Sequence, residues 1–365
     1  MTSELLSVPG LGPKRVKSLN DNNLDTLEKI KAASFYQLLD VPHIGFKTAW
    51  NLKKYLGQGI DCQDMQEFVD DTMIQPLKIE NKLVKPWQAS KKDGIIQMQP
   101  TDFSLESTTV WSFPDRGSWA THTPEYRGNW SPRVVRNVIL RYSKEGDTVL
   151  DPMVGGGTTL VEAMLTGRNS IGIDVNVNSI TIAKNRINFP EDLKNDLPDV
   201  TSKVYVGDAR NMNLLDDESI HLIAAHPPYA NIIKYGERIR GDLSIIPDYL
   251  IFAEEMERVA KEMYRVLKPG SYCAILMGDT HNKSHYVPMA FKIMIKFLEV
   301  GFILKEDIIK HEWNCWNNAK WKHTANDRFL LTMHEHLFIF RKMSADENPT
   351  EYKNSSLDLF REALE

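Results

Sequence analysis

The sequence predicts an α/β protein in which a mostly parallel sheet carries helices on both faces, with a small all-helical domain before it. Beyond residue 105, apolar stretches of strand length alternate with helix-like stretches, a rhythm typical of parallel sheets. A glycine run at residues 155–157 follows one of these strands. In the first 56 residues a motif repeats after 33 positions, from Val8 to Val41, which indicates a separate repeat-built unit.

Length and composition allow a large core and exclude some classes of protein. The 365 residues, 42% of them hydrophobic, are enough for two or three domains. The formal net charge of -5 means that any surface for nucleic acid is a local patch. Cys62, Cys273 and Cys315 lack paired spacing, which indicates reduced thiols in a cytoplasmic protein. Because no stretch resembles a signal peptide or a membrane span, we expect a soluble protein without a membrane partner.

The repeat in residues 1–56, here called the helical module, has the pattern of two helix-hairpin-helix units. Val8-Pro9-Gly10-Leu11-Gly12 recurs as Val41-Pro42-His43-Ile44-Gly45, and a helix-like stretch follows each copy. The pair resembles the tandem form found in DNA repair and replication proteins. In that family the hairpin glycines let backbone N–H groups approach a phosphate at a helix N-terminus. Gly10, Gly12 and Gly45 fit, whereas His43 replaces a glycine, so we expect the second hairpin to hold phosphate less well.

Basic residues behind both hairpins favour contact with a nucleic-acid backbone irrespective of its sequence. They are Lys14, Arg15, Lys17, Lys47, Lys53 and Lys54. The alternative is a small helical domain that only packs or dimerises. Residues 57–105 are expected to be a connector with a short helix around residues 65–73 and without chemistry of their own. Residues 346–365 are expected to form an acidic tail.

Three predicted strands end in aspartates and indicate a ligand pocket. The strands at residues 147–151, 170–174 and 204–209 bring Asp151, Asp174 and Asp208 to the carboxyl edge of the sheet, where parallel sheets bind ligands. Asp174 lies at the spacing at which a carboxylate meets ribose hydroxyls. A NAD-binding domain is the rival interpretation, but the glycine spacing differs from GxGxxG. Any one acid could instead cap a helix or sit in a loop.

The three acids in series resemble the S-adenosylmethionine pocket of class I methyltransferases. The resemblance implies a Rossmann-like sheet over residues 106–345 and S-adenosylmethionine as the cofactor. It places Asp151 and the glycine turn around the methionine portion, Asp174 at the ribose and Asp208 at the adenine amino group. The rest of the implied cofactor-binding set is Pro152, Gly155, Gly157, Thr158, Thr159 and Ala209.

A fourth predicted strand, residues 220–225, leads into His226-Pro227-Pro228-Tyr229. Two prolines fix two φ angles, so the loop is stiff and can aim its carbonyls at one point. Acceptors that bind both hydrogens of an exocyclic amine help its nitrogen attack a sulfonium methyl, and Tyr229 can stack on a base. The motif resembles that of the amino-methylating DNA methyltransferases, which make N6-methyladenine or N4-methylcytosine. The resemblance extends from a segment at residues 111–132, implied to close over the cofactor, to a closing strand at residues 334–340.

His226 departs from this family, which carries Asp, Asn or Ser before Pro-Pro-aromatic. A neutral imidazole can accept a hydrogen bond from the target amine, whereas a protonated one can only donate. If the ring faces the substrate, activity is therefore expected to be lost at mildly acid pH; alternatively, only the loop carbonyls act and the ring packs. The departure leaves the base open: cytosine N4 is slightly favoured over adenine N6. The runner-up is methylation of RNA at cytidine N4 or guanine N2, and a non-catalytic binding protein is the rival class.

Little chain is left to read a base sequence, so DNA, with RNA as the alternative, is expected to contact two loops besides the helical module. The loops at residues 230–246 and 311–329 are basic and partly aromatic, which suits backbone contacts plus stacking. Their expected contact residues are Lys234, Arg238, Trp316 and Trp321. A cognate restriction nuclease and the oligomeric state stay open. No metal is expected, because the spacings of His311, Cys315, His323, His334 and His336 match no common site.

Overall fold

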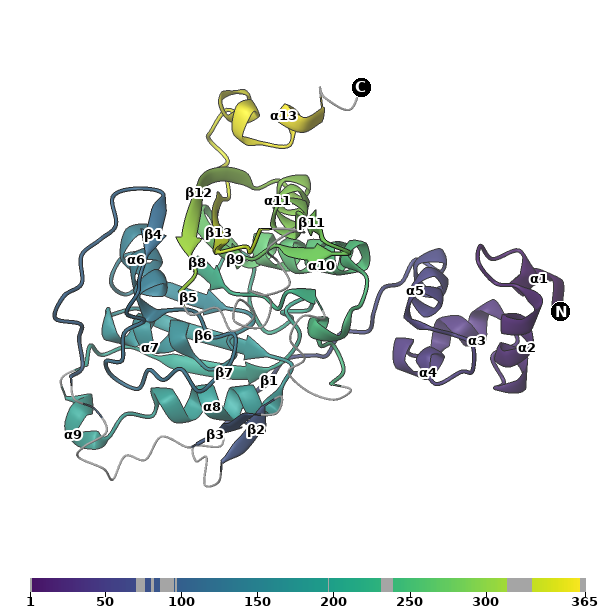
Figure 1. Ribbon diagram of the computed structural model, residues 1–365, viewed down its shortest axis with the longest axis horizontal. Helices are drawn as coiled ribbons and strands as arrows, with labels where there is room; N and C mark the ends of the chain where they lie inside the picture. The colour runs from purple at the N-terminus through teal and green to yellow at the C-terminus, as the bar shows by residue number, and fades with distance from the viewer. Residues whose placement is uncertain are drawn as a thin grey trace.

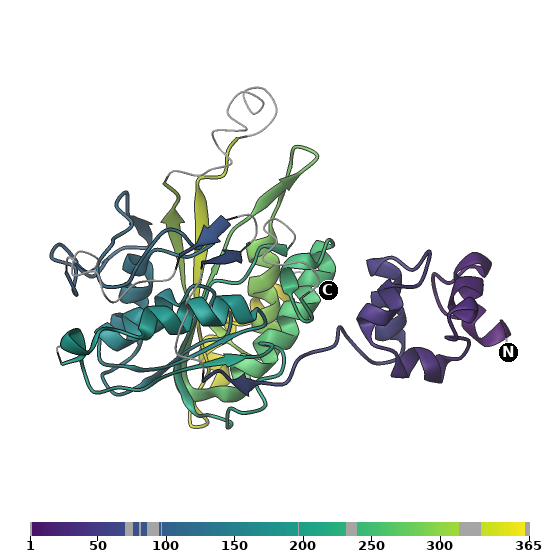
Figure 2. The same cartoon turned by 90° about the horizontal axis from the view of Figure 1, so that it is seen from below.

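The computed structural model describes residues 2–69, 76–79, 82–85, 95, 97–195, 197–230, 239–313 and 330–361. The helical module lies beside a larger sheet domain, and an extended stretch of the connector joins the two (Figures 1 and 2). Four of the predicted nucleic-acid contacts lie outside the described residues: Lys234, Arg238, Trp316 and Trp321.

The helical module consists of short helices around a small apolar core that includes the fully buried Leu19 and Phe35. Its two hairpins share one backbone geometry. Gly12 and Gly45 cap the helices that follow, with ψ of 169° and 172° and without a side-chain cap. His43 (φ 67°) takes the left-handed conformation that Gly10 (φ 85°) takes in the first copy. The helices are α1 (Thr2–Leu6), α2 (Pro13–Asp21), α3 (Leu27–Ala32), α4 (Phe35–Leu39) and α5 (Phe46–Tyr55).

The central sheet has nine described strands, in the order β1-β7-β6-β5-β8-β9-β13-β12-β4. The five from β7 to β9 are parallel, whereas β13 runs antiparallel to both β9 and β12. The strands are β1 (Gln66–Glu67), β4 (Val110–Ser112), β5 (Thr148–Asp151), β6 (Asn169–Asp174), β7 (Ser202–Val206), β8 (Ile220–Ala225), β9 (Leu267–Met277), β12 (Ile303–His311) and β13 (His334–Arg341).

Helices cover both faces of the sheet, so the predicted fold class is confirmed (Figure 1). On one face, apolar side chains such as Val138 and Leu160 pack against the strands from α6 (Pro132–Tyr142), α7 (Thr158–Leu165) and α8 (Val177–Ile187). On the other face α10 (Tyr249–Val266) and α11 (Met289–Val300) supply the main core, with Phe252 and Phe297 fully buried.

The connector is part of the sheet rather than a passive link. The prediction of a helix around residues 65–73 is wrong for residues 65–69, which the structure describes. Gln66 and Glu67 form β1 there and pair antiparallel with Val206 and Tyr205 of β7. The free N–H and C=O groups at the edge of β7 explain the difference, since they offer the chain ladder hydrogen bonds. Met65 anchors the pairing, being buried next to Gly207.

The remaining elements are short and lie around the sheet domain. Helices α9 (Glu191–Lys194) and η2 (Leu243–Ile245) lie in loops, and the tail at residues 346–361 contains η3 (Pro349–Ser355) and α13 (Asp358–Arg361), with Leu357 and Phe360 packed on the main core. The hairpins are β2 (Leu77–Ile79) with β3 (Lys82–Val84), and β10 (Thr280–Asn282) with β11 (His285–Val287). None of the described helices has the length and apolarity needed to span a bilayer.

Candidate functional site

A cavity opens at the carboxyl ends of the parallel strands, where the strand order reverses. From β5 the chain builds β6 and β7 on one side and β8 on the other, and such a switch point is where α/β sheets bind ligands. The cavity holds about 770 Å³ of space, part of it open to solvent. It is lined by residues 128–130, 151–156, 174–176, 207–209 and 241–243 together with Tyr126, His226 and Pro228.

The structure brings most of the predicted cofactor residues to this cavity. Those that line it are Asp151, Pro152, Gly155, Asp174, Asp208 and Ala209. The other three predicted residues lie behind the cavity wall. Thr159 Oγ1 donates to Asp151 Oδ2 at 2.5 Å, and Thr158 Oγ1 donates to Asn129 Oδ1. Gly157 takes φ 83°, and a Cβ there would lie 2.9 Å from Ala183 Cα, so this glycine lets α7 approach α8.

Asp174 ties the glycine turn to the end of β6. Its Oδ2 accepts from the Gly155 N–H at 3.0 Å, and its Oδ1 accepts from the Asn176 N–H at 2.9 Å. Burial raises the pKa of Asp174 to about 7, and it raises that of Asp151 to about 7 as well. Two buried carboxyls at one pocket edge are acceptors suited to hydroxyl and amino donors of a bound nucleoside.

Asp208 is already engaged by a buried arginine, which the sequence did not reveal. Arg210 Nε lies 2.9 Å from Asp208 Oδ1, and its terminal nitrogen lies 2.7 Å from Oδ2. The same guanidinium forms an ion pair with Glu255 of α10. Glu255 also forms an ion pair with Arg258, whose terminal nitrogen lies 2.7 Å from its carboxylate oxygen. Two carboxylates and two guanidiniums balance in charge. Since each carboxylate oxygen accepts more than one hydrogen bond, Asp208 keeps capacity for a further donor.

The segment that precedes the first central strand lies over the cavity. Tyr126 packs its ring against Gly155 and Gly156, and its hydroxyl is 2.9 Å from Ser179 Oγ. A carboxylate of α7 anchors this segment. Glu162, which has no exposed surface, accepts hydrogen bonds from Trp119 Nε1 and from His122 Nε2, both at 2.7 Å. The expectation that residues 111–132 close over the pocket thus has a structural basis at Tyr126 and at residues 128–130.

At the other end of the cavity, His226 and Tyr229 belong to a buried hydrogen-bonded chain. His226 Nε2 lies 2.6 Å from the Tyr229 hydroxyl, which donates to Glu335 Oε1 at 2.5 Å. Lys310 of β12 donates to Glu335 Oε2 at 2.9 Å and also pairs with Glu312. Burial opposes ionisation of Glu335, but the charge of Lys310 and a hydrogen bond from Glu312 outweigh it and hold its pKa below its usual range.

The direction of this chain fixes the protonation of His226. Because ionised Glu335 only accepts, Tyr229 donates to it and its oxygen accepts from Nε2–H of His226. Nδ1 is buried and has no partner within hydrogen-bond geometry among the described residues, and the Gly128 backbone beside the ring favours its protonated form. Burial lowers the pKa of His226 to about 4, against the smaller opposing effects of Glu335 and the Gly128 backbone, so the ring is neutral at pH 7.

These contacts favour one of the two roles considered for His226. Nε2 is occupied by Tyr229, Nδ1 is out of contact with solvent, and the ring lies 6.0 Å from that of Trp130. The imidazole contacts Tyr229 and also lines the cavity, so its role toward the substrate stays a prediction. A ring whose pKa is about 4 does not by itself support the loss of activity expected at mildly acid pH. The alternative, in which the loop carbonyls meet the amine, agrees with this arrangement.

Tyr229 itself lies behind the cavity lined by His226 and Pro228. Its ring packs on Gly278, where a Cβ would lie 2.7 Å away, and Pro227 is buried. Stacking of Tyr229 on a base stays a prediction. Sequence reasoning missed Glu335 and Lys310, although a charged residue inside the apolar closing strand was a signal for the first.

The basic residues of the helical module lie in different surroundings: one is buried, two pair with acids of the sheet domain, and others lie behind the first hairpin. Lys53 is 1% exposed and donates to the carbonyls of Lys31 and Ala33, so its expected contact with phosphate is wrong. Backbone carbonyls at the end of α3 capture the ammonium instead. Two further lysines face α10: Lys54 pairs with Glu254 at 2.6 Å and Lys47 with Asp248 at 3.5 Å.

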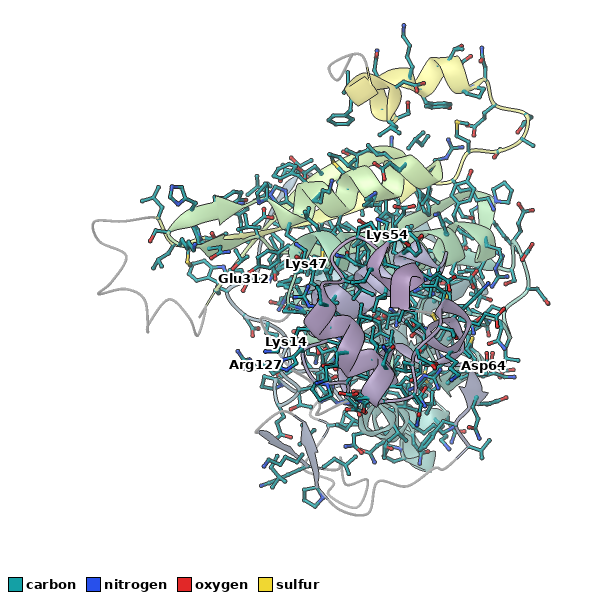
Figure 3. All side chains as sticks on the ribbon, turned by 90° about the vertical axis from the view of Figure 1, so that its right-hand side faces the viewer. Lys14, Lys47, Lys54, Asp64, Arg127 and Glu312 are labelled. Atoms are coloured by element: carbon teal, nitrogen blue, oxygen red, sulfur yellow. The ribbon has the colours of Figure 1, made fainter. Side chains whose placement is uncertain are left out.

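Lys14 and Arg15 lie behind the first hairpin. Arg15 holds that hairpin by donating to the Gly10 carbonyl at 2.6 Å, while Lys14 is exposed. Seen from the side of the module, Lys14 and Lys47 lie toward the same edge as Arg127 and Glu312, and Asp64 lies toward the opposite edge (Figure 3). Lys47, with a side chain that is 74% exposed, keeps a surface for other partners.

The histidines that suggested a metal are used in other ways where the structure describes them. His336 Nδ1 lies 3.0 Å from Asp307 Oδ1, and the rings of His334 and His336 meet edge to face. Within the described ranges, no three side chains of the metal-binding types come together. Cys315 and His323 lie outside them.

Comparison with known families shows which family the chain belongs to. A family model described as DNA methylase, for the N6/N4 methyltransferases, matches residues 46–185 and 220–361, well over half of the chain. The chain belongs to the DNA methylase family. Its helical module matches the SAM-like helix-hairpin-helix tandem over residues 2–57, and residues 138–275 match an RMKL-like methyltransferase domain. The expected family and its cofactor, S-adenosylmethionine, are thereby confirmed.

Several similar proteins are bacterial and archaeal type II methyltransferases. M.MjaI of Methanocaldococcus jannaschii is 30% identical over 29% of this chain and 44% of its own. M2.LlaDCHI of Lactococcus lactis is 43% identical over 25% of this chain and 31% of its own. M.BslI of a Bacillus species is 22% identical over 73% of this chain and 30% of its own. The chain thus spans less than half the length of each. Among solved structures, a SAM-dependent methyltransferase of Methanosarcina mazei aligns with 56% of this chain and 97% of its own, at TM-score 0.38 and 18% identity.

We predict that Asp174→Ala weakens binding of S-adenosylhomocysteine, because it removes a buried acceptor and releases the Gly155 amide. Hydrogen bonds to a charged group contribute roughly 1.5–3 kcal/mol, which corresponds to a ~10–100-fold rise in Kd. Calorimetric titration with S-adenosylhomocysteine measures this rise in Kd. Asp199→Ala, at an exposed aspartate, is the matched control. Equal affinity in the two variants would contradict the placement of Asp174 at the ribose.

We predict that two substitutions of Tyr229 separate its hydroxyl from its ring. Tyr229→Phe removes only the hydrogen bonds to His226 and Glu335, so single-turnover methyl transfer should slow ~2–10-fold. Tyr229→Ala should slow it a further ~5–100-fold if the ring stacks on a base. Affinity for S-adenosylhomocysteine should stay constant in both. Equal rates for the two variants would show that the ring does not hold the substrate.

Proposed function

We propose that this DNA methylase transfers a methyl group from S-adenosylmethionine to an exocyclic amino group of a base in DNA, with cytosine N4 favoured over adenine N6. One observation carries the proposal: His226 and Pro228 of the Pro-Pro loop line the same cavity as Asp151 and Asp174. The loop that would hold the base and the acids that would hold the cofactor thus share one space. A methyl transfer in a single displacement requires that proximity.

The cavity suits a nucleoside cofactor. Asp174 would accept from the ribose hydroxyls and Asp208 from the adenine amino group, while Asp151 and the turn at residues 152–156 would surround the methionine portion. A further acceptor, Asp242 Oδ2, is buried without a partner among the described residues. When bound, S-adenosylmethionine supplies an electrophilic methyl group on a sulfonium.

The Pro-Pro loop would align the amine. Its carbonyls accept the amine hydrogens, so the nitrogen lone pair turns toward the methyl carbon. In the transfer the C–N bond would form as the C–S bond of the donor breaks, the electron pair of the broken bond would stay on sulfur, and the nitrogen would lose a proton to solvent. His226 and Glu335 contribute by fixing Tyr229, on which an extruded base can stack.

The helical module would hold the phosphate backbone. Gly12 and Gly45 provide no side-chain cap to the first N–H groups of α2 and α5, and in α2 these begin at Lys14 because Pro13 has no N–H. Lys14 is also exposed behind the first hairpin. Helix N-termini of this kind bind phosphate oxygens through backbone N–H groups. This contact is independent of base sequence.

The decisive experiment incubates the protein with isotopically labelled S-adenosylmethionine and with DNA or RNA, followed by mass spectrometry of the nucleosides. Labelled N4-methylcytidine or N6-methyladenosine in their deoxy forms supports the proposal and identifies the base. Label in RNA alone assigns the runner-up, cytidine N4 or guanine N2 methylation. Binding of cofactor without label in either polymer would indicate a non-catalytic binding protein.

We predict that the ratio of turnover between the wild type and His226→Ala stays constant from pH 5 to pH 8. Burial lowers the pKa of His226 to about 4, so the neutral ring persists down to that pH and protonation removes its function only below it. Steady-state rates at saturating cofactor measure the ratio. A wild-type acid limb with an apparent pKa near the ordinary value of ~6.5, absent in the variant, would show that the ring is exposed to solvent and titrates freely.

A further inference from the structure

One wall of the cofactor cavity is held from outside the methyltransferase domain. Among the described residues, three side chains from elsewhere in the chain hydrogen-bond to the backbone of this wall segment, residues 240–243. Arg210 donates to the Gly241 carbonyl at 3.0 Å. Gln63 of the connector donates to the Arg240 carbonyl at 2.7 Å, and the Gly241 N–H donates to the Tyr36 hydroxyl of α4 at 2.7 Å.

Leu243 packs this segment into the core, whereas Gly241 has no side chain to pack and is held through its backbone. Gly241 takes φ 87°, and a Cβ there would lie 2.5 Å from Asp208 Oδ2. The backbone itself therefore lies against the carboxylate expected to meet the adenine. Burial raises the pKa of Tyr36, which keeps the phenol neutral and its oxygen able to accept from the Gly241 amide.

Asp242 is the side chain that this wall segment brings to the cavity. Its Oδ1 accepts from the Ser244 N–H at 2.7 Å, and its Oδ2 is buried without a partner among the described residues. Its charge lies close enough to Asp174 to raise the pKa of that acid. A buried acceptor without a partner is costly, and a donor from a ligand in the cavity would offset that cost.

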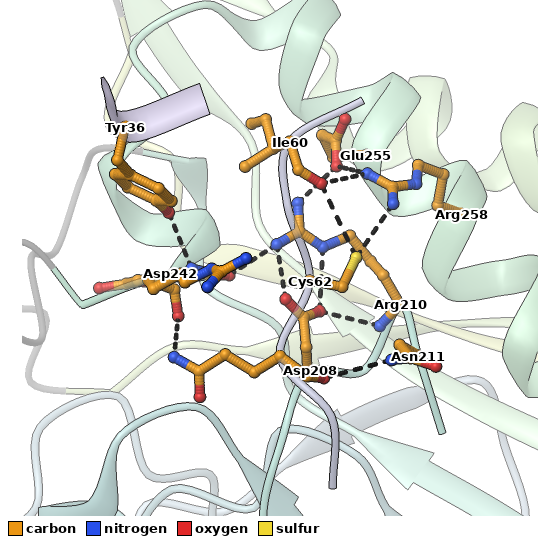
Figure 4. Close-up of polar contacts among 12 residues, drawn as sticks. Tyr36, Ile60, Cys62, Asp208, Arg210, Asn211, Asp242, Glu255 and Arg258 are labelled. Carbon is orange, nitrogen blue, oxygen red and sulfur yellow. Dashed lines mark hydrogen bonds and ion pairs between the residues drawn. The ribbon is translucent and has the colours of Figure 1, made fainter. Parts of the chain in front are cut away.

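Further contacts join the helical module and the connector to the same place. Arg258 donates to the Ile60 carbonyl at 2.9 Å and to Cys62 Sγ at 3.0 Å, and it also pairs with Glu255. Figure 4 shows the connector residues Ile60 and Cys62 among Asp208, Arg210 and Glu255, with Tyr36 and Asp242 to one side of them. The connector is thus bound to the same region as Tyr36 of the helical module.

We propose that the helical module is a working part of the cofactor site: Tyr36 and Gln63 hold the wall segment so that Asp242 meets the nucleoside of S-adenosylmethionine. This inference rests on the proposed function for the identity of the cofactor. It makes Tyr36 a positioning residue, which acts on the ligand through the Gly241 backbone. It also means that residues 1–56 do more than bind DNA.

The test is calorimetric titration of Tyr36→Phe with S-adenosylhomocysteine. Loss of one hydrogen bond, roughly 0.5–1.5 kcal/mol, should raise Kd ~2–10-fold. In steady-state assays KM for S-adenosylmethionine should rise by a similar factor, with a smaller change in kcat. Tyr55→Phe, at an exposed tyrosine of α5 in the same module, is the matched control and should bind like the wild type.

A double-mutant cycle with Asp242→Asn separates positioning from general loosening. If Tyr36 acts through Asp242, the double variant should lose less affinity than the sum of the single losses in binding free energy. Additive losses, or a Tyr36→Phe protein that binds like the wild type, would overturn the inference and leave the proposed function standing. A wild-type protein that does not bind S-adenosylhomocysteine at all would overturn both.

Discussion

The cofactor half of this molecule depends on one buried guanidinium. Arg210, which has no exposed side-chain surface, pairs with Asp208 after β7 and with Glu255 on α10, and it donates to the Gly241 carbonyl. Removing one partner of such a buried pair leaves an uncompensated charge and costs about 3–5 kcal/mol. The strand end, the helix on the far face and the cavity wall must therefore come together in one arrangement. Asp208 is held in a fixed orientation before any ligand arrives.

The catalytic end follows the same physical rule with a lysine in place of the arginine. Lys310 keeps Glu335 ionised within the protein, and the resulting acceptor orders the hydroxyl of Tyr229 and then the ring of His226. The position before Pro-Pro-Tyr is filled here by an imidazole that hydrogen-bonds to the Tyr229 hydroxyl. Preorganised hydrogen bonds of this kind lower the cost of aligning groups during reaction.

The sequence predicted which acids line the cavity because the pattern is local: an acid after each parallel strand reaches the same edge of the sheet, as Asp151, Asp174 and Asp208 do. It did not predict what those acids contact. Glu335 meets Tyr229 across 106 positions of sequence, and the Gly241 amide beside Asp242 donates to Tyr36, 205 positions earlier. Lys53 looked like a phosphate contact until the carbonyls around it buried it. Burial also lowers the pKa of His226. How deeply one ring is buried depends on tertiary packing and cannot be read from a sequence pattern.

The short outer strands have a consequence for solubility. Both described edges of the large sheet are closed by pieces of chain that precede the pocket: β1, of two residues, lies on β7, and β4, of three residues, lies on β12. An uncovered strand edge is a template for pairing with another molecule, and very short outer strands blunt it. The connector and the segment before α6 therefore guard the sheet against edge-to-edge association. A fragment that lacks β1 and β4 would keep the pocket residues but expose the edges of β7 and β12, which could then pair with strands of other molecules.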